Sequence, residues 1–180
     1  MDDAKFLTET IREFRRSRKV AEGAIAQVPA GKLAEEPAPG SNSVAILMKH
    51  ISGNMRSRWT DFLTTDGEKP DRDRDREFEL DDTDDPAKLR AAWDQAWDTL
   101  FAALAGLTPG HLESVTVRIR GEELTVVEAI QRQLTHYAYH VGQIVYVAKW
   151  LAGPAWKTLS IPRGGSKAFN EAPRPYRRPE

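Results

Sequence analysis

Hydrophobic residues recur every three or four positions through four long stretches of the chain, with charged and polar residues between them. This spacing places the apolar side chains on one face of an α-helix, so each stretch predicts an amphipathic helix. We expect these helices over residues 3–27, 44–63, 86–105 and 126–151. The last stretch has the clearest pattern of the four.

Helix-start residues precede three of these stretches and support their positions. They are Ser41 or Ser43 before the second helix, Asp84 or Asp85 with Pro86 before the third, and Thr125 with Glu128, which form a Thr-x-x-Glu capping box, before the fourth. Between the last two helices, residues 114–127 alternate hydrophobic and polar positions around Gly121. That alternation predicts a short β-hairpin.

The arrangement of these elements predicts an all-α fold: a four-helix bundle with a long crossover loop and a small hairpin before the last helix. We expect a single domain over residues 1–180, with 157–180 as a C-terminal tail. The long loop, residues 64–85, has two interpretations. It is a solvated linker whose alternating charges cancel, or a lid or rim over the mouth of the bundle.

Charge and composition narrow the range of partners. The 26 basic and 27 acidic residues give a net charge of -1, so we expect no general attraction to nucleic acid or to an anionic membrane. No apolar run approaches the roughly 20 residues of a membrane helix, and no secretory signal is visible. The sequence has no cysteine, which excludes disulfides, cysteine-ligated zinc and a cysteine nucleophile, and fits a reducing cytoplasm.

Two of the four histidines, His136 and His140, lie four residues apart on the last helix, at the edge of its apolar stripe. Positions i and i+4 share a helix face, so these rings are either packed structural residues or two ligands of one metal ion. The residues between them are Tyr-Ala-Tyr, so the glutamate base of a His-Glu-x-x-His protease is missing. The metalloprotease interpretation is therefore discarded.

A third ligand would come from the second helix, where His50 borders the apolar stripe. Three histidines would leave coordination positions open for water or a substrate. Asn54, one turn after His50, and Gln133 and Gln143, which flank the histidine pair, are the candidate pocket residues. The fourth histidine, His111, follows Pro-Gly, and we expect it on a surface loop.

Several other residues have both a structural and a functional interpretation. Arg56 and Arg58 are either exposed helix charges or ligands for a carboxylate. Residues 162–166, Pro-Arg-Gly-Gly-Ser, are either a packed tail segment, which we favour, or an anion-binding loop, although no helix is expected after them. We expect Trp59, Trp93, Trp97 and Trp150 to pack in the core or an interface, Tyr137 to be structural, and Tyr139 to be a candidate dimer contact.

Three segments together resemble the DinB/YfiT-like superfamily of bacterial metal-binding four-helix bundles. They are LMKHISGNMRSRWTDFLTTDGEKPDRDRDREFE, LTHYAYHVGQIVYVAKWL and WKTLSIPRGGSKAFN. The resemblance is to an uncharacterised branch and covers most of the chain. It implies a zinc or nickel ion bound by His50, His136 and His140, and a homodimer.

The same resemblance implies an activity. Some members of the superfamily are metal-dependent thiol S-transferases that join a low-molecular-weight thiol, such as bacillithiol, mycothiol or glutathione, to an electrophile. A protein without cysteine has to take its thiol from outside, and a metal ion lowers the pKa of a bound thiol. Two alternatives remain open: a metal-dependent hydrolase, and a non-enzymatic dimeric binding or stress-response protein with a structural or vestigial metal. No catalytic protein base is evident from the sequence.

Overall fold

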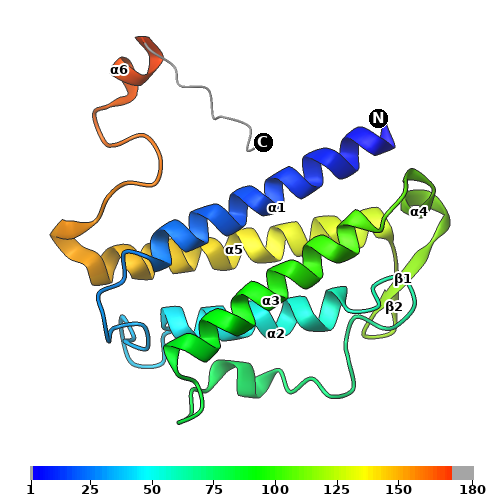
Figure 1. The fold of residues 1–180 in the computed structure, drawn as a ribbon, viewed down its shortest axis with the longest axis horizontal. Helices are drawn as coiled ribbons and strands as arrows, with labels where there is room; N and C mark the ends of the chain where they lie inside the picture. The colour runs from blue at the N-terminus through cyan, green and yellow to red at the C-terminus, as the bar shows by residue number, and fades with distance from the viewer. Residues whose placement is uncertain (1, 172–180) are drawn as a thin grey trace.

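The computed structural model describes residues 2–171, and this part of the chain is mostly helical, with six α-helices and one two-stranded sheet (Figure 1). The α-helices are α1 (Asp3–Ile25), α2 (Val44–Trp59), α3 (Pro86–Ala105), α4 (Pro109–Ser114), α5 (Val126–Ala152) and α6 (Ser166–Glu171). Two 3-10 helices, η1 (Asp75–Phe78) and η2 (Gly153–Ala155), and the strands β1 (Thr116–Ile119) and β2 (Glu122–Thr125) complete the fold. The predicted helical class is confirmed.

The four long helices pack pairwise around one hydrophobic core. Helix α1 lies along α5, α2 packs against both α3 and α5, and α1 also contacts α3 (Figure 1). The apolar side chains of each long helix are therefore buried against a neighbouring helix. Trp59, Trp93 and Trp97 are buried in this core as expected, whereas Trp150 is 48% exposed on α5. Burial of such large side chains is the main source of stability in a helical fold.

A hydrogen-bonded chain of three buried side chains joins α2 to α5. The indole Nε1 of Trp59 donates to the hydroxyl of Tyr137 at 3.0 Å, and that hydroxyl donates to Oδ1 of Asn54 at 3.0 Å. Tyr137 is fully buried, which confirms its structural role. Because Asn54 lies one turn after His50 and Tyr137 follows His136, this chain fixes the relative height of the two histidine-bearing helices.

The caps expected from sequence are present, but α2 ends earlier than predicted. Ser43, Asp85 and Thr125 each accept a backbone N–H at a helix start, and Glu128 completes its capping box. Helix α2 ends at Trp59 rather than near residue 63, because Asp61 adopts a left-handed conformation and its carbonyl accepts the N–H groups of the next turn. Phe62 still packs on the Trp59 ring, at 4.8 Å between centroids, which explains why the apolar spacing continues beyond the helix.

The expected hairpin is confirmed, and it is anchored to the crossover loop. Strands β1 and β2 pair antiparallel with Ile119 opposite Glu122, so Arg120 and Gly121 form the two-residue turn with positive φ values of 56° and 76°. The carboxylate of Asp66 accepts the backbone N–H groups of both turn residues at 2.8 Å. These bonds hold the hairpin tip beside the start of the loop.

Two short helices lie where the sequence suggested none. Helix α4 begins at Pro109, and the ring of His111 accepts the backbone N–H of Thr108 as part of a capping box, so His111 is a half-buried helical residue rather than a loop residue. Helix α6 follows the Pro-Arg-Gly-Gly-Ser segment. Both are too short for hydrophobic periodicity to reveal them.

The part of the tail that the structure describes begins against the helical core. Trp156 packs on the core, and Gln27 exchanges hydrogen bonds with the backbone of Lys157 at 2.6 and 3.0 Å. The expectation for residues 172–180 falls outside the described residues. Over residues 2–171, none of the helices has the length and apolar character needed to cross a membrane.

Candidate metal centre

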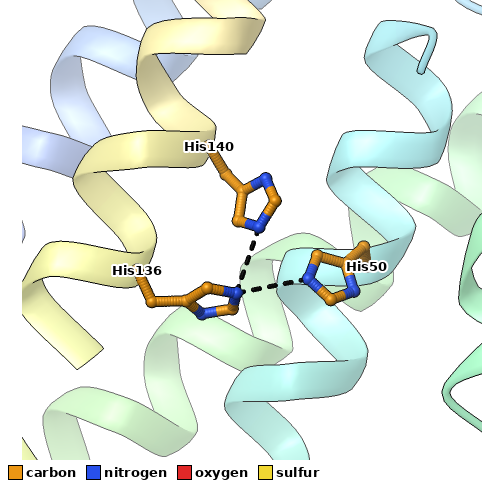
Figure 2. A group of neighbouring side chains, drawn as sticks. All are labelled: His50, His136 and His140. Atoms are coloured by element: carbon orange, nitrogen blue, oxygen red, sulfur yellow. Dashed lines mark hydrogen bonds between the residues drawn. The ribbon is translucent and has the colours of Figure 1, made fainter. Parts of the chain in front are cut away.

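Three histidine side chains from two helices point toward one another (Figure 2). His136 and His140 project from adjacent turns of α5, and His50 faces them from α2. Nε2 of His136 lies 3.0 Å from Nε2 of His140 and 3.3 Å from Nε2 of His50. One ligand nitrogen from each ring lies within 4.8 Å of the other two. The i, i+4 pair and the third histidine therefore meet at one point.

The spacing of the nitrogens fits tetrahedral coordination. Zinc–imidazole bonds of about 2.0–2.1 Å at a tetrahedral angle place two ligand nitrogens roughly 3.3 Å apart. Of the two separations at His136, the 3.3 Å to His50 equals this value and the 3.0 Å to His140 is slightly shorter. The third pair, His50 and His140, lies within the 4.8 Å that encloses all three ligand nitrogens.

Hydrogen bonds to the outer ring nitrogens set the orientation of two of the rings. Nδ1 of His50 lies 2.9 Å from Oε2 of Glu77, and Nδ1 of His140 lies 2.7 Å from Oε1 of Gln143. Carboxylate and amide oxygens are acceptors, so both Nδ1 atoms carry the proton and both Nε2 atoms present a lone pair. A single proton on His136 can serve only one of these lone pairs, whereas a cation satisfies all three rings.

Glu77 is itself held by a buried arginine from the crossover loop. Arg72 donates to both carboxylate oxygens of Glu77 at 2.8 Å and to Glu68 at 3.0 Å. The side chains of Arg72 and Glu77 are only 3% and 8% exposed. Burial raises the pKa of Glu77, but the hydrogen bonds from Arg72 and His50 outweigh it and the pKa is lowered. Glu77 is therefore an ionised acceptor for the Nδ1 proton of His50.

The surroundings keep the α5 histidines neutral. Burial, the other two rings, and the charges of Arg58 and Arg72 lower the pKa of His136 to about 3. Burial also lowers the pKa of His140, partly offset by the hydrogen bond to Gln143. Metal coordination needs the neutral imidazole, so these shifts hold the rings in the form that binds a cation.

A cavity of about 470 Å³ opens beside the three histidines. Its lining comes from α2 and the segment before it, α5, the crossover loop and the hairpin. The lining residues are Asn42, His50, Asn54, Arg58, Arg72, Arg74, Phe78, Arg120, Arg132, Gln133, His136, Tyr139, His140 and Gln143. Among these described residues none is acidic, and five are arginines.

The other candidate residues also line this cavity, except Arg56 and His111. Asn54, Gln133 and Gln143 all line the cavity, and Gln143 also binds a metal-centre ring. Arg58 is 7% exposed and lines the cavity, so the interpretation of it as an exposed charge is wrong, whereas that interpretation holds for Arg56. His111, on α4, does not belong to the three-histidine group.

Sequence reasoning did not identify Glu77 and Arg72 as parts of the centre. Both lie in the charged crossover loop, whose alternating Asp and Arg residues suggested a solvated linker. Their burial shows that this interpretation fails for the middle of the loop, residues 72–78, which forms part of the cavity rim through Arg74 and Phe78. The one local signal for a buried acid was Glu77, which stands beside Phe78 at the end of the Asp-Arg repeat.

Of the comparisons with known proteins, only the one with protein families finds a match. A family described as "Protein of unknown function (DUF1572)" matches residues 2–165, which is nearly the whole described part of the chain. No curated protein and no solved structure matches the chain significantly.

Proposed function

The chain belongs to the DUF1572 family of proteins of unknown function, and from its three-histidine geometry we propose that it binds one divalent metal ion through His50, His136 and His140 and works as a metal-dependent thiol S-transferase. The observation that carries the proposal is the convergence of three Nε2 atoms at the edge of a cavity. Zinc and nickel are the proposed ions, because both accept imidazole ligands.

The donor set supports a catalytic rather than a structural metal. A structural zinc site is normally closed by four protein ligands, whereas a catalytic site has three and keeps one position for water or substrate. In the part of the chain that the structure describes, these three histidines are the only cluster of three or more His, Cys, Asp or Glu side chains placed to hold a metal ion. All three histidines line the cavity, where a second molecule can enter.

The lining of the cavity argues against hydrolysis of the His-Glu-x-x-His type. A metal hydrolase of the His-Glu-x-x-His type uses a carboxylate to take a proton from water, and the described lining residues include no acid. A metal ion held by His50, His136 and His140 would lower the pKa of a bound thiol without a protein base. The thiolate sulfur would form a bond to the electrophilic carbon, the leaving group would depart with its electron pair, and the thiol proton would pass to solvent.

We also propose that the DUF1572 chain is a DinB/YfiT-like four-helix bundle that works as a homodimer. Pairwise packing of the four long helices, and the segment that links α2 to α3, support the bundle. The exposed aromatic residues on α5, Tyr139 at 63% and Tyr146 at 71%, support contact between two copies. Analytical ultracentrifugation of the protein and a Tyr146→Glu variant tests the dimer.

Metal analysis tests the centre. We expect the purified, metal-reconstituted protein to hold about one divalent ion per chain, and His136→Ala to hold none. His111→Ala is the matched control, because it removes a histidine outside the centre and leaves the metal content unchanged. Absence of bound metal in the unmutated protein, or its loss in His111→Ala, contradicts the proposed ligands.

An activity screen tests the reaction. The zinc-loaded and nickel-loaded proteins are mixed with bacillithiol, mycothiol or glutathione and with 1-chloro-2,4-dinitrobenzene, and release of chloride and formation of the thioether are followed. We expect at least one thiol to react faster with the loaded protein than with His136→Ala. Equal rates across all thiols and several electrophile classes would favour a non-enzymatic binding protein.

A further inference from the structure

The cavity beside the metal centre is lined by arginines from four different parts of the chain. Arg58 comes from α2, Arg72 and Arg74 from the crossover loop, Arg120 from the hairpin turn and Arg132 from α5. Segments far apart in sequence thus place like charges around one space. Like charges repel, so such a grouping is stabilised by counter-ions or by an anionic ligand.

The protein's own acids neutralise the two inner arginines. Arg72 donates hydrogen bonds from Nε, Nη1 and Nη2 to Glu68 and Glu77. Nη1 of Arg58 donates to Glu68 and to the carbonyl of Gly67. These two side chains are buried, at 3% and 8% exposed. Arg58 and Arg72 are thus mainly parts of the support for the metal centre.

Three outer arginines, Arg74, Arg120 and Arg132, which we call the rim arginines, keep donors for a ligand. Arg132 uses Nη1 on Glu122 and Arg120 uses Nε on Glu68. A guanidinium has five N–H donors, so each retains several beyond the bonds found within residues 2–171. The guanidinium of Arg74 stacks on the Phe78 ring at 5.0 Å, which orients it at the cavity edge. All three are about half exposed.

The acids that pair with these arginines do not face the cavity. Glu68, Asp75, Glu77 and Glu122 are absent from the described lining, so the lining itself contains arginines and no acids. An anion in the cavity would relieve this excess of positive charge.

A buried amide gives a second, independent sign of a ligand. Gln133 lines the cavity one turn before His136 and is only 4% exposed, yet its Oε1 makes no hydrogen bond within residues 2–171. A buried polar atom without a partner is destabilising. Trp93 and Trp97 also have unpaired indole N–H groups within residues 2–171, but of the three only Gln133 lines the cavity, where a bound molecule can reach it. The amide offers a hydrogen bond to an amide or hydroxyl group of a bound molecule.

We propose that the rim arginines form an anion subsite beside the three-histidine centre, which binds an organic molecule carrying two or more carboxylate or phosphate groups and an amide or hydroxyl group. The rim holds the anionic end, and Gln133 binds the polar middle. The placement of the other end at the metal rests on the proposed function. Anion binding at the rim does not, because no rim arginine belongs to the metal centre.

The test uses metal-free protein, so that it is independent of the metal. Isothermal titration calorimetry with propane-1,2,3-tricarboxylate and with pyrophosphate separates carboxylate from phosphate ligands, and the neutral triamide of the tricarboxylate is the uncharged control. We expect one anion to bind at one site per chain, more weakly at high salt, and the triamide not to bind. No binding of either anion at low salt overturns the subsite while leaving the metal stoichiometry test unaffected.

Matched arginine pairs locate the binding. Arg132→Ala and Arg118→Ala each remove one charge and one ion pair to a neighbouring glutamate, and only Arg132 lines the cavity. Arg74→Ala and Arg76→Ala form a second pair within the loop. We expect the cavity variants to weaken anion binding roughly 3- to 10-fold and the controls less than about 2-fold. Equal weakening in both members of each pair means diffuse attraction and overturns the proposal.

Discussion

The Nδ1 atom of His50 lies 2.9 Å from the carboxylate of Glu77, which is 27 residues further along the chain. Through this contact, the crossover loop orients a ligand of the candidate metal centre. Arg72, from the same loop, binds both oxygens of Glu77 and keeps it in place. The loop is thus the outer support of the centre, although it contributes none of the three proposed ligands.

Replacing Glu77 should weaken metal binding without removing a ligand. Glu77→Gln keeps the shape of the side chain but loses the charge that holds the Nδ1 proton of His50. Outer partners of this kind typically contribute 10- to 100-fold to metal affinity, and we expect a loss of about that size in a competition titration with a zinc indicator. Glu79→Gln, which removes an exposed partner of Arg76, is the control and should bind as the unmutated protein does. Unchanged affinity in Glu77→Gln would show that His50 is oriented by packing alone.

The contact between Glu77 and α2 also depends on Gly53. A Cβ atom at this position would lie 2.4 Å from Oε1 of Glu77, and Arg72 and His50 hold that carboxylate so that it cannot move away freely. We expect Gly53→Ala to displace Glu77 and weaken metal binding roughly tenfold, in line with a lost outer partner.

Gly142→Ala on α5 is the matched control, because a Cβ there meets nothing within 4 Å. Alanine is favoured over glycine inside a helix, so this variant should be stabilised by about 0.5–1 kcal/mol and bind metal normally. Denaturant unfolding and the same metal titration measure both effects. Normal metal affinity in Gly53→Ala would contradict the role assigned to the close approach.

Acid should destabilise the metal-free protein before it reaches the range where carboxylates titrate. His136 has a pKa of about 3 in the folded chain, against an ordinary value near 6.5 in an unfolded one. Between these values the unfolded chain binds more protons, so the free energy of unfolding falls as the pH drops through this range. The lowered pKa of His140 acts in the same direction.

Urea unfolding at pH 7 and pH 5 checks this expectation. The metal-free protein should be less stable at pH 5, and His136→Gln, which cannot take up the proton, should lose less stability over the same interval. Equal losses in the two proteins would mean that His136 does not titrate as its surroundings imply. Metal-loaded protein should release its ion over the same pH range, because protons compete for the ring nitrogens.

A substitution at Arg120 in the hairpin turn should raise stability and weaken anion binding at the same time. Arg120 has a φ of 56°, a left-handed conformation that asparagine adopts more readily, and Asn-Gly is the favoured pair for a two-residue turn. Arg120→Asn should therefore raise the free energy of unfolding by up to about 1 kcal/mol, after loss of the exposed pair with Glu68. It should at the same time weaken anion binding at the rim.

Arg118→Asn is the comparison within the same hairpin. Arg118 lies in β1 rather than in the turn, and asparagine is a poor strand residue, so this change should lower stability. Denaturant unfolding of both variants separates the two effects. A destabilised Arg120→Asn would mean that the left-handed backbone at this position carries no penalty for arginine.

Local interactions explain which features could be predicted from sequence. Helix periodicity, capping by Ser43, Asp85 and Thr125, and the turn at Gly121 all depend on residues within a few positions of one another. The shared face of His136 and His140 is equally local, because it follows from the helix repeat. The predicted end of α2 was wrong, because Phe62 continues the apolar spacing beyond the helix. Its packing on Trp59 does not need helical geometry.

By itself, the sequence determined the four long helices, the hairpin and the three histidines as candidate ligands, since each follows from a short repeat or a residue type. Tertiary structure decided the distance between His50 and His136, the burial of Arg58, and the role of Glu77 and Arg72. The charged loop has no periodicity that marks one acid or arginine among its neighbours. Only its path over α2 brings Glu77 to His50 and Arg74 to the edge of the cavity, because burial and pairing of a charge depend on what packs against it.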